Sequence, residues 1–336
     1  MKKLIIISVT LFIATLASGQ REKLLLDLRG SWKFNIGDKE YWKDESYDDE
    51  EWQSIFVPAA WENEGFSGYD GFAWYRKTFD FPLKGRPQYI TFDAGYIDDA
   101  DQVYLNGQLI GMDGSMPPHF RTAYSSHRRY TVPTTLLKDR NNVIAIRVYD
   151  KSIDGGIIKG RIGFFENTDV PESIYPLAGV WKFNKGDNFS WSEADYNDED
   201  WENAMIPGSW KGYKDYSFTK FWGSDISYAW YRKQFVIPQY LENRSDLVLI
   251  LGKIDDFDKT YLNGHLIGET NDGQPYGSSH SYDELRIYAI PPRYLNDYGI
   301  NTIAVRIKDI GGEAGIYEGP IVICREQDVR QALRAF

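Results

Sequence analysis

Two clusters of aspartates have the residue types and the spacing that could carry chemistry. Each is an Ile-Asp-Asp-x-Asp run, and the aspartates are Asp98, Asp99, Asp101, Asp255, Asp256 and Asp258. Carboxylates this close repel one another unless positive charge compensates them. In one interpretation they bind a ligand or Ca²⁺, which takes oxygen ligands from loops. In the other they form structural turns, accept backbone N–H hydrogen bonds and pair with arginines, and their presence in both halves of the chain favours this structural role.

Arginines and tryptophans pose the same choice between ligand binding and framework. Four arginines at strand-like positions could clamp a ligand, and they are Arg76, Arg147, Arg232 and Arg306. A strand arginine more often pairs with a nearby carboxylate, and we expect such pairing, including with the aspartate clusters. Aromatic residues make up 16% of the chain, and flat rings suit both a core and the stacking of sugar C–H faces. Six tryptophans occupy corresponding places in the two halves, so we assign them to the framework: Trp32, Trp52, Trp74, Trp181, Trp201 and Trp230.

The elements that must position these residues are short β-strands. β-Branched and aromatic residues, several of them alternating with polar ones, predict strands at residues 88–94, 102–105, 142–149 and 247–251. Asn106-Gly107 and Asn263-Gly264 lie between strand ends and predict two-residue hairpins, because both residue types tolerate positive φ. One helical turn is expected at residues 48–52 and another at 197–201, where acidic residues suit a first turn. Many short strands with Gly and Pro turns predict an all-β fold of β-sandwiches, with a jelly roll as the expected topology.

An internal repeat sets the domain organisation. Gly-Ser-Trp-Lys-Phe-Asn at residues 30–35 recurs as Gly-Val-Trp-Lys-Phe-Asn at 179–184, and Ala-Trp-Tyr-Arg-Lys at 73–77 recurs unchanged at 229–233. Each copy is long enough to hold its own core. We therefore predict a first domain at residues 23–166, a linker at 167–172, a second domain at 173–324 and a tail at 325–336.

The N-terminal residues predict an export signal at residues 1–19. Two lysines precede an apolar run at residues 4–17, which is too short to span a bilayer comfortably. Ala17 and Gly19 supply the small residues of a cleavage site, so we expect cleavage after Gly19. No other long apolar run occurs, and we expect a periplasmic or extracellular protein without membrane insertion.

Composition excludes several classes of function. The formal net charge is −11, so phosphate backbones are repelled and a nucleic-acid partner is not expected. Cys324 is the single cysteine, which excludes cysteine-based zinc and iron–sulfur sites. No two of the four histidines have the spacing of a metal-binding helix. No cofactor is expected, apart from a structural Ca²⁺ at the aspartate clusters.

Taken together, the repeated motifs resemble a known family. Both halves contain Gly-x-Trp-Lys-Phe-x-x-Gly-Asp, Ala-Trp-Tyr-Arg-Lys-x-Phe and Ile-Asp-Asp-x-Asp-x-x-Tyr-Leu-Asn-Gly-x-x-Ile-Gly, followed by a late aspartate and a Gly-rich stretch. This pattern resembles the N-terminal sugar-binding domain of glycoside hydrolase family 2, the β-galactosidase and β-glucuronidase family. It is also similar to the copy of that domain in sialate O-acetylesterases. The resemblance implies two tandem galactose-binding-like jelly-roll β-sandwich domains, which in the family flank a separate catalytic domain.

The resemblance also implies where a saccharide binds. In the family, the loop before the Trp-Tyr-Arg strand and the loop with the late aspartate face the sugar. The candidates are therefore Trp61, Tyr69, Asp70, Asp150, Trp210, Trp222, Asp225 and Asp309. The loop at residues 210–227 is rich in aromatic residues, and it forms either a sugar platform or a contact with the first domain.

No catalytic residue is assigned. The two units leave no room for the family's catalytic barrel, and the Gly-Asp-Ser block of sialate-type esterases is absent. We therefore expect an exported, non-catalytic carbohydrate-binding protein whose partners are a glycan or oligosaccharide and a catalytic glycosidase. Two alternatives stay open: a hydrolase or accessory subunit of the family 2 or sialate O-acetylesterase type, and a scaffold protein without a sugar site.

Overall fold

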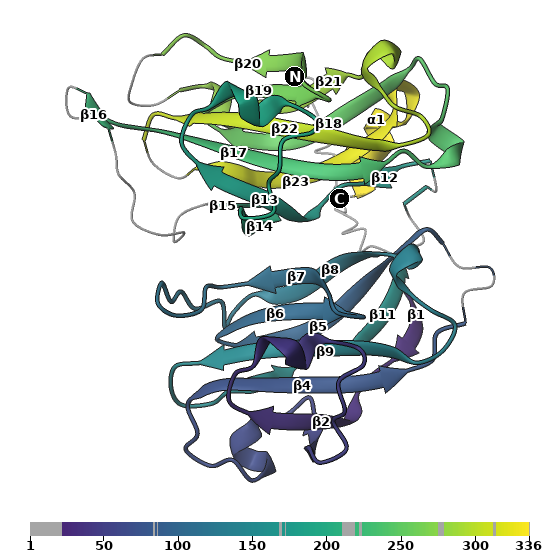
Figure 1. The fold of residues 1–336 in the computed structure, drawn as a ribbon, viewed down its shortest axis with the longest axis vertical. Helices are drawn as coiled ribbons and strands as arrows, with labels where there is room; N and C mark the ends of the chain where they lie inside the picture. Colours follow the sequence, from purple (N-terminus) through teal and green to yellow (C-terminus); the bar gives the residue numbers. More distant parts are fainter. Residues whose placement is uncertain are drawn as a thin grey trace, which may run out of the picture.

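The computed structural model describes residues 22–82, 85, 87–167, 170–171, 173–209, 219–221, 224–274, 279–311 and 314–335. Figure 1 shows two β-rich bodies along the long axis, the N-terminal half in purple to teal and the C-terminal half in teal to yellow. We call them the N-terminal unit (residues 22–167) and the C-terminal unit (residues 173–335). The predicted export signal lies outside the described residues. No helix in the described ranges has the length and apolar character needed to cross a bilayer.

The N-terminal unit contains two antiparallel sheets. The first has five strands in the order β1 (Glu22–Asp27), β11 (Gly163–Asn167), β5 (Tyr89–Asp98) and β10 (Gly156–Lys159), with β8 (His127–Pro133) also paired to β5. The second has six strands in the order β3 (Gln53–Val57), β2 (Gly30–Ile36), β4 (Gly71–Phe79), β9 (Asn142–Asp150), β6 (Ala100–Leu105) and β7 (Gln108–Asp113). The four strands predicted from the sequence are confirmed here and in β18 of the C-terminal unit.

The C-terminal unit has the corresponding strand order. Its five-stranded sheet runs β12 (Tyr175–Pro176), β23 (Gly315–Arg325), β18 (Leu247–Asp255) and β21 (Leu285–Ala289), with β15 (Gly208–Ser209) paired to β23. Its larger sheet runs β14 (Glu202–Ile206), β13 (Gly179–Lys185), β17 (Ser224–Val236), β22 (Ile300–Asp309), β19 (Phe257–Leu262) and β20 (His265–Thr270), with β16 (Thr219–Phe221) paired to β17.

Each pair of sheets encloses an apolar core, so each unit is a β-sandwich. In β2 the alternate residues Trp32 and Phe34 are buried, and in β13 Trp181 and Phe183 follow the same pattern. These residues belong to one core cluster in each unit. All six tryptophans assigned to the framework are buried, which confirms that assignment. The all-β class is confirmed as well, because the only α-helix among the described residues is a short one near the C-terminus.

The two Asn-Gly hairpins are confirmed. Asn106 and Gly107 have φ of 49° and 81°, and they join β6 to β7 with Leu105 opposite Gln108. Asn263 and Gly264 have φ of 49° and 83° at the matching turn. Positive φ at both central residues gives a turn whose twist matches that of the flanking strands.

The helical turns predicted at residues 48–52 and 197–201 are not helices. Asp48 Oδ1 accepts a hydrogen bond from Glu50 N at 3.0 Å, and this local side-chain bond favours a turn over a helix. Asn197 does the same with Glu199 N at 2.9 Å. The short 3₁₀ helices of the described chain are η1 (Glu40–Lys43), η2 (Trp61–Glu64), η3 (Thr134–Leu136), η4 (Phe189–Ser192), η5 (Gln239–Leu241), η6 (Ser281–Asp283), η7 (Pro292–Tyr294) and η8 (Glu326–Asp328).

The residues predicted as a tail pack on the C-terminal unit. After η8, the helix α1 (Val329–Ala335) places Ala332 in a cluster with Ile250, Val322 and Cys324. The neighbouring residues Leu249 and Ile323 belong to the core between the sheets, so this cluster lies on the outer face of the five-stranded sheet.

Candidate ligand-binding site

The last aspartate of each cluster is a framework residue. Asp101 is fully buried and accepts hydrogen bonds from Arg128 Nε and from Tyr130 Oη, both at 2.7 Å. In the C-terminal unit, Asp258 accepts one from Arg286 Nε at 3.0 Å, again with both side chains fully buried. Each carboxylate forms a buried ion pair with an arginine. Asp101 and Asp258 are therefore removed from the predicted calcium ligands.

The arginines predicted to compensate the clusters bind other aspartates. The pairs are Arg76 with Asp49, Arg147 with Asp38, Arg232 with Asp198 and Arg306 with Asp187. Their assignment as framework arginines is confirmed, but the expected pairing with the Ile-Asp-Asp-x-Asp aspartates is wrong. The reason is that the last aspartate of each cluster and these arginines lie on opposite faces of the larger sheet. Asp101 points inward to β8, whereas Arg147 binds Gln102, the next residue of β6, which points outward.

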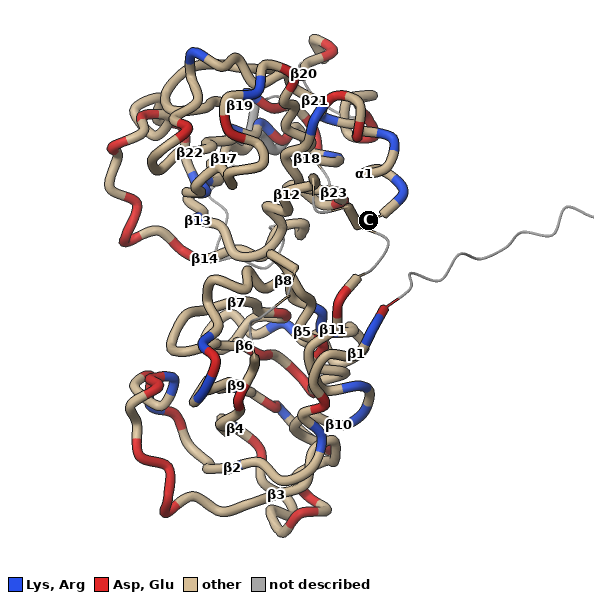
Figure 2. Tube along the Cα trace, turned by 90° about the vertical axis from the view of Figure 1, so that its right-hand side faces the viewer, with Lys and Arg blue, Asp and Glu red and all other residues tan. Residues whose placement is uncertain are grey.

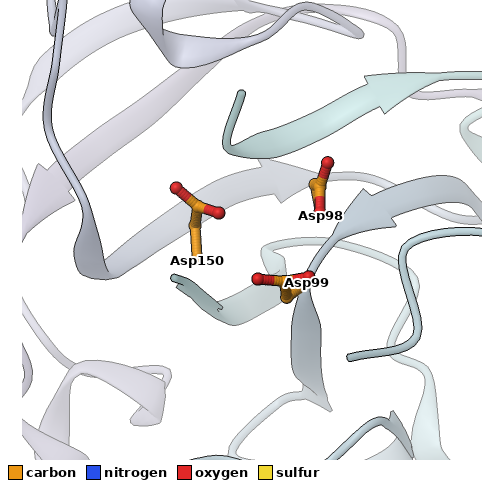
Figure 3. A group of neighbouring side chains, drawn as sticks. All are labelled: Asp98, Asp99 and Asp150. Atoms are coloured by element: carbon orange, nitrogen blue, oxygen red, sulfur yellow. The ribbon is translucent and has the colours of Figure 1, made fainter. Parts of the chain in front are cut away.

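The first two aspartates of the N-terminal cluster join the late aspartate of β9. Asp98 ends β5 and Asp150 ends β9, and Asp99 follows Asp98 through a cis peptide bond. One carboxylate oxygen from each of the three lies within 4.8 Å of the others. Figure 3 shows the three side chains around a common space. The structure thus brings together Asp150 with Asp98 and Asp99.

Asp150 supplies the distinctive feature of this site. Its side chain is buried, and Oδ1 accepts a hydrogen bond from Ser152 N at 3.1 Å. Oδ2 is buried with no hydrogen-bond partner among the described residues. Asp99 differs, because Thr122 Oγ1 donates to its Oδ1 and Lys151 N donates to its Oδ2 at 3.0 Å. A buried carboxylate oxygen without a donor is costly, and it marks a place where a ligand donor would be stabilised.

Burial and mutual repulsion raise the pKa values of this group. Burial, followed by the charge of Asp99, raises the pKa of Asp98 to about 7. Burial also raises the pKa of Asp150 to about 6, with further contributions from the charges of Asp99, Asp70 and Glu62. The site therefore carries an excess of negative charge that hydrogen-bond donors or a cation would relieve.

These pKa values predict a stability change with pH. Both carboxyls bind protons more tightly in the folded than in the unfolded chain, so the stability they contribute is lost as pH rises from about 4 to about 7. The free energy of unfolding of Asp150→Asn, measured with urea, is expected to exceed that of the wild type by about 1–2 kcal/mol at pH 7.5. At pH 4.5, closer to the ordinary pKa of an aspartate, the difference is expected to be smaller.

The matched control is Asp309→Asn in the C-terminal unit. Asp309 accepts a hydrogen bond on each carboxylate oxygen, so its substitution is expected to lower stability at pH 7.5. A wild type as stable as Asp150→Asn at pH 7.5 would contradict the raised pKa of Asp150.

Of the predicted stacking residues, Trp61 is placed in the core. Its side chain has no exposed area, and its Nε1 donates a hydrogen bond to Tyr69 O at 3.1 Å. Tyr69 is half-buried, and its hydroxyl donates to Phe72 O at 2.7 Å. Trp61 therefore has no exposed ring face on which a sugar could stack. Asp70 is exposed and lies close enough to raise the pKa of Asp150.

Glu62, next to Trp61, is a further residue of this site that the sequence did not single out. Its Oε2 accepts a hydrogen bond from Gly155 N at 3.0 Å, and its Oε1 is buried without a partner among the described residues. The charge of Glu62 also raises the pKa of Asp150. Glu62 could not be singled out, because its contact with Gly155 links loops far apart in sequence.

In the C-terminal unit the late aspartate has the donor that Asp150 lacks, whereas Asp256 is bound much as Asp99 is. Ser227 lies opposite Asp309 in the β17–β22 pair and donates to Asp309 Oδ2 at 3.1 Å. In the N-terminal unit the residue opposite Asp150 is Gly71, which has no side chain to donate. Ser279 likewise donates to Asp256 Oδ1 at 2.7 Å, and Ile310 N donates to Oδ2 at 2.9 Å. Among the described residues, only the N-terminal unit presents a three-carboxylate group.

The remaining candidates lie outside the described part of the chain. Trp210 and Trp222 are not among the described residues. Asp225 lies in β17, opposite Lys220 of β16, and its side chain falls outside the description as well. The predicted aromatic platform at residues 210–227 is therefore left as a prediction, and the candidate site is the carboxylate group of the N-terminal unit.

Comparison with known proteins identifies a related domain. Residues 186–313 match the family model described as the second all-beta domain of beta-galactosidase. The beta-galactosidase BoGH2A of Bacteroides ovatus is 29% identical over 169 residues, which cover 46% of this chain. A domain related to glycoside hydrolase family 2 is therefore present.

The relatives are much longer than the matched segments. The chain spans 19% of BoGH2A. It covers 28% of the Bacteroides uniformis beta-glucuronidase structure, with 88% of this chain aligned at 13% identity and a TM-score of 0.35. It covers 29% of a Bacteroides vulgatus beta-glycosidase, with 84% aligned at 16% identity and a TM-score of 0.35. It covers 36% of a putative Bacteroides fragilis beta-galactosidase, with 87% aligned at 15% identity and a TM-score of 0.36.

Proposed function

We propose that this chain is an exported, non-catalytic carbohydrate-binding protein built from two tandem galactose-binding-like jelly rolls. We place its saccharide site at the end of the N-terminal unit that carries Asp98, Asp99 and Asp150. The proposal is supported by the relation to family 2 domains and by the corresponding strand orders of the two units. The apolar run at residues 4–17 supports export.

The observation that carries the site is the buried, unpartnered Oδ2 of Asp150. Vicinal hydroxyls of a sugar are donors, and a hydrogen bond to a carboxylate is stronger than one between neutral groups. Asp98 and Asp99 offer further acceptors within 4.8 Å. A saccharide that places one hydroxyl on Asp150 and a second on Asp98 would satisfy the acceptors that the protein leaves open. Asp70, exposed near Asp150, lies where a longer glycan would pass.

Calorimetric titration of purified protein with galactosides, glucuronides and plant or algal polysaccharides tests this proposal. Asp150→Asn is expected to bind the responding glycan at least tenfold more weakly, because one charged hydrogen bond is lost. Asp309→Asn, the matched change in the C-terminal unit, is expected to bind within twofold of the wild type. Folded wild-type protein that binds none of these glycans contradicts the proposal, and a loss confined to Asp309→Asn moves the site to the other unit.

Calcium is the other species that could compensate these carboxylates. Ca²⁺ takes six to eight oxygen ligands, and the described chain offers three carboxylates here after Asp101 is removed. The titrations are therefore repeated in EDTA and in calcium. If glycan binding is independent of calcium, the carboxylates act directly on the sugar.

A hydrolytic role is the second candidate, and one observation favours it. Asp98 and Asp150 are neighbouring carboxyls whose pKa values are both raised, which is the arrangement from which general acids are made. Retaining glycosidases place two carboxyls at a similar separation, ~5 Å. Turnover of chromogenic glycosides by the wild type, abolished in Asp98→Asn, would favour hydrolysis over binding alone.

A further inference from the structure

A groove lies where the two units meet. Strand β7 of the N-terminal unit lies beside β13 and β14 of the C-terminal unit, as Figure 1 also shows. The groove between them is lined by residues of both units, and those used below are Gln108, Thr131, Tyr175, Asn203, Lys233 and Gln234. Asp98 and Asp150 are not among the residues that line it.

Among the described residues, Lys233 is the only charged one that lines this groove. Its Nζ donates a hydrogen bond to Val180 O at 2.7 Å and has no carboxylate partner among the described residues. Burial is the single cause that lowers its pKa, to about 8. An ammonium group withdrawn from water without a counter-charge is stabilised by any anion that reaches it.

The corresponding lysine of the N-terminal unit is partly compensated by a nearby aspartate. Lys77 pairs with Ile144 as Lys233 pairs with Ile303, and its Nζ donates to Ser31 O at 2.8 Å. Burial lowers the pKa of Lys77, but the charge of Asp27 partly offsets this effect. The same lysine position thus has a nearby negative charge in one unit, whereas at the groove burial is the single cause of the lowered pKa.

Polar side chains line the same groove as Lys233. The amides of Gln108, Asn203 and Gln234 are exposed, and no described residue binds their side chains in a hydrogen bond. Thr131 adds a hydroxyl to the lining, and Tyr175 adds an aromatic ring. Amides and hydroxyls both donate and accept, so they suit the hydroxyl groups of a sugar.

We propose that this groove binds a sugar that carries a carboxylate, with the carboxylate on Lys233 and the hydroxyls on Gln108, Asn203 and Gln234. This is a second site, beyond the proposed function of the carboxylate group. Asp and Glu residues are spread over both bodies, as Figure 2 shows, and the acidic end of the N-terminal unit disfavours anions. The groove supplies the local cation that an acidic sugar requires.

Titration with trigalacturonate, followed by calorimetry, tests the groove. Lys233→Met is expected to weaken binding at least tenfold, whereas the matched Lys77→Met is expected to bind within twofold of the wild type. Neutral galactotriose is expected not to bind in the groove. Circular dichroism confirms that both variants are folded. Equal binding by Lys233→Met and the wild type overturns the proposal, and tighter binding of a sulfated galactotriose than of trigalacturonate overturns the carboxylate assignment.

A second readout separates this groove from the carboxylate group. Trigalacturonate is expected to raise the pKa of Lys233. This pKa is measured by NMR of the ¹³C-methylated lysines of the protein. The Lys233 signal is assigned as the one that is absent from the spectrum of Lys233→Met. Asp150→Asn is expected to leave this response unchanged. If Asp150→Asn abolishes it, the ligand binds at the carboxylate group and the groove is not a site. If Asp150→Asn fails to alter binding of neutral glycans while Lys233→Met removes trigalacturonate binding, the proposed function fails and the groove stands.

Discussion

Arg128→Met is expected to lower the free energy of unfolding of the N-terminal unit by about 3–5 kcal/mol, because it removes one partner of a fully buried ion pair. The guanidinium binds Asp101 at 2.7 Å, donates to Ser126 O at 2.6 Å and to Asp99 O at 3.0 Å, and also donates to Ala123 O. Methionine leaves Asp101 charged and buried, with the Tyr130 hydroxyl as its remaining side-chain donor among the described residues. Urea denaturation at pH 7 measures the loss.

Two comparisons make this prediction specific. Arg286→Met removes the matching pair with Asp258 and is expected to lower the stability of the C-terminal unit by a similar amount. Arg29→Met removes an exposed pair with Asp27, and exposed pairs contribute about 0–1 kcal/mol. If Arg128→Met destabilises no more than Arg29→Met, the Asp101 pair is not the framework of the aspartate cluster. Such a result would return Asp101 to the set of ligand candidates.

Trp61→Ala is expected to destabilise the N-terminal unit by about 3–5 kcal/mol, the usual effect of truncating a buried tryptophan. The indole is fully buried and packs against Gly155, where an added Cβ would lie 2.2 Å from the ring. Its backbone N also donates to Gly155 O at 3.0 Å. The substitution therefore loosens the loop that carries Glu62 and the loop that follows Asp150. Thermal unfolding measures the effect on the unit.

The control for this change is Phe56→Ala, because Phe56 is 57% exposed and its truncation is expected to alter stability by less than ~1 kcal/mol. A stacking residue and a core residue give different results here. If Trp61→Ala retains the wild-type stability and loses glycan binding, Trp61 stacks on a sugar and its placement in the core is wrong. If it loses both together, the binding loss follows from the loop and says nothing of stacking. Asp150→Asn is therefore the cleaner probe of the site.

Local features of the sequence predict much of the fold. The Asn-Gly pairs predict the β6–β7 and β19–β20 hairpins because the required positive φ is a property of those two residues alone. The Trp-x-Phe spacing in β2 and β13 predicts burial because successive side chains of a strand alternate between faces. The helical turn predicted at residues 48–52 is wrong. The acidic residues there suit the start of a helix, but the sequence does not show that the Asp48 carboxylate accepts a hydrogen bond from Glu50 N and so stabilises a turn.

The site depends on contacts that the sequence alone does not specify. Arg128 was not singled out, since its pairing with Asp101 joins the two sheets of the sandwich. Asp150 was implied only by family resemblance, and its open Oδ2 depends on strand register, which places Gly71 and not a serine opposite it. Ser227 stands at that place in the other unit. The difference between Gly71 and Ser227 can be interpreted only when the residues that they face on the paired strand are known.

Helix α1 packs in the same apolar cluster as Cys324, the single cysteine of the chain. Cys324 lies under Ala332 on the outer face of the five-stranded sheet, and burial raises the pKa of its thiol to about 12. The thiolate is the reactive form, so this cysteine resists oxidation and intermolecular disulfide formation while α1 is docked. Reaction of Cys324 with a thiol reagent is therefore expected to accompany the opening of this cluster, to which α1 contributes Ala332.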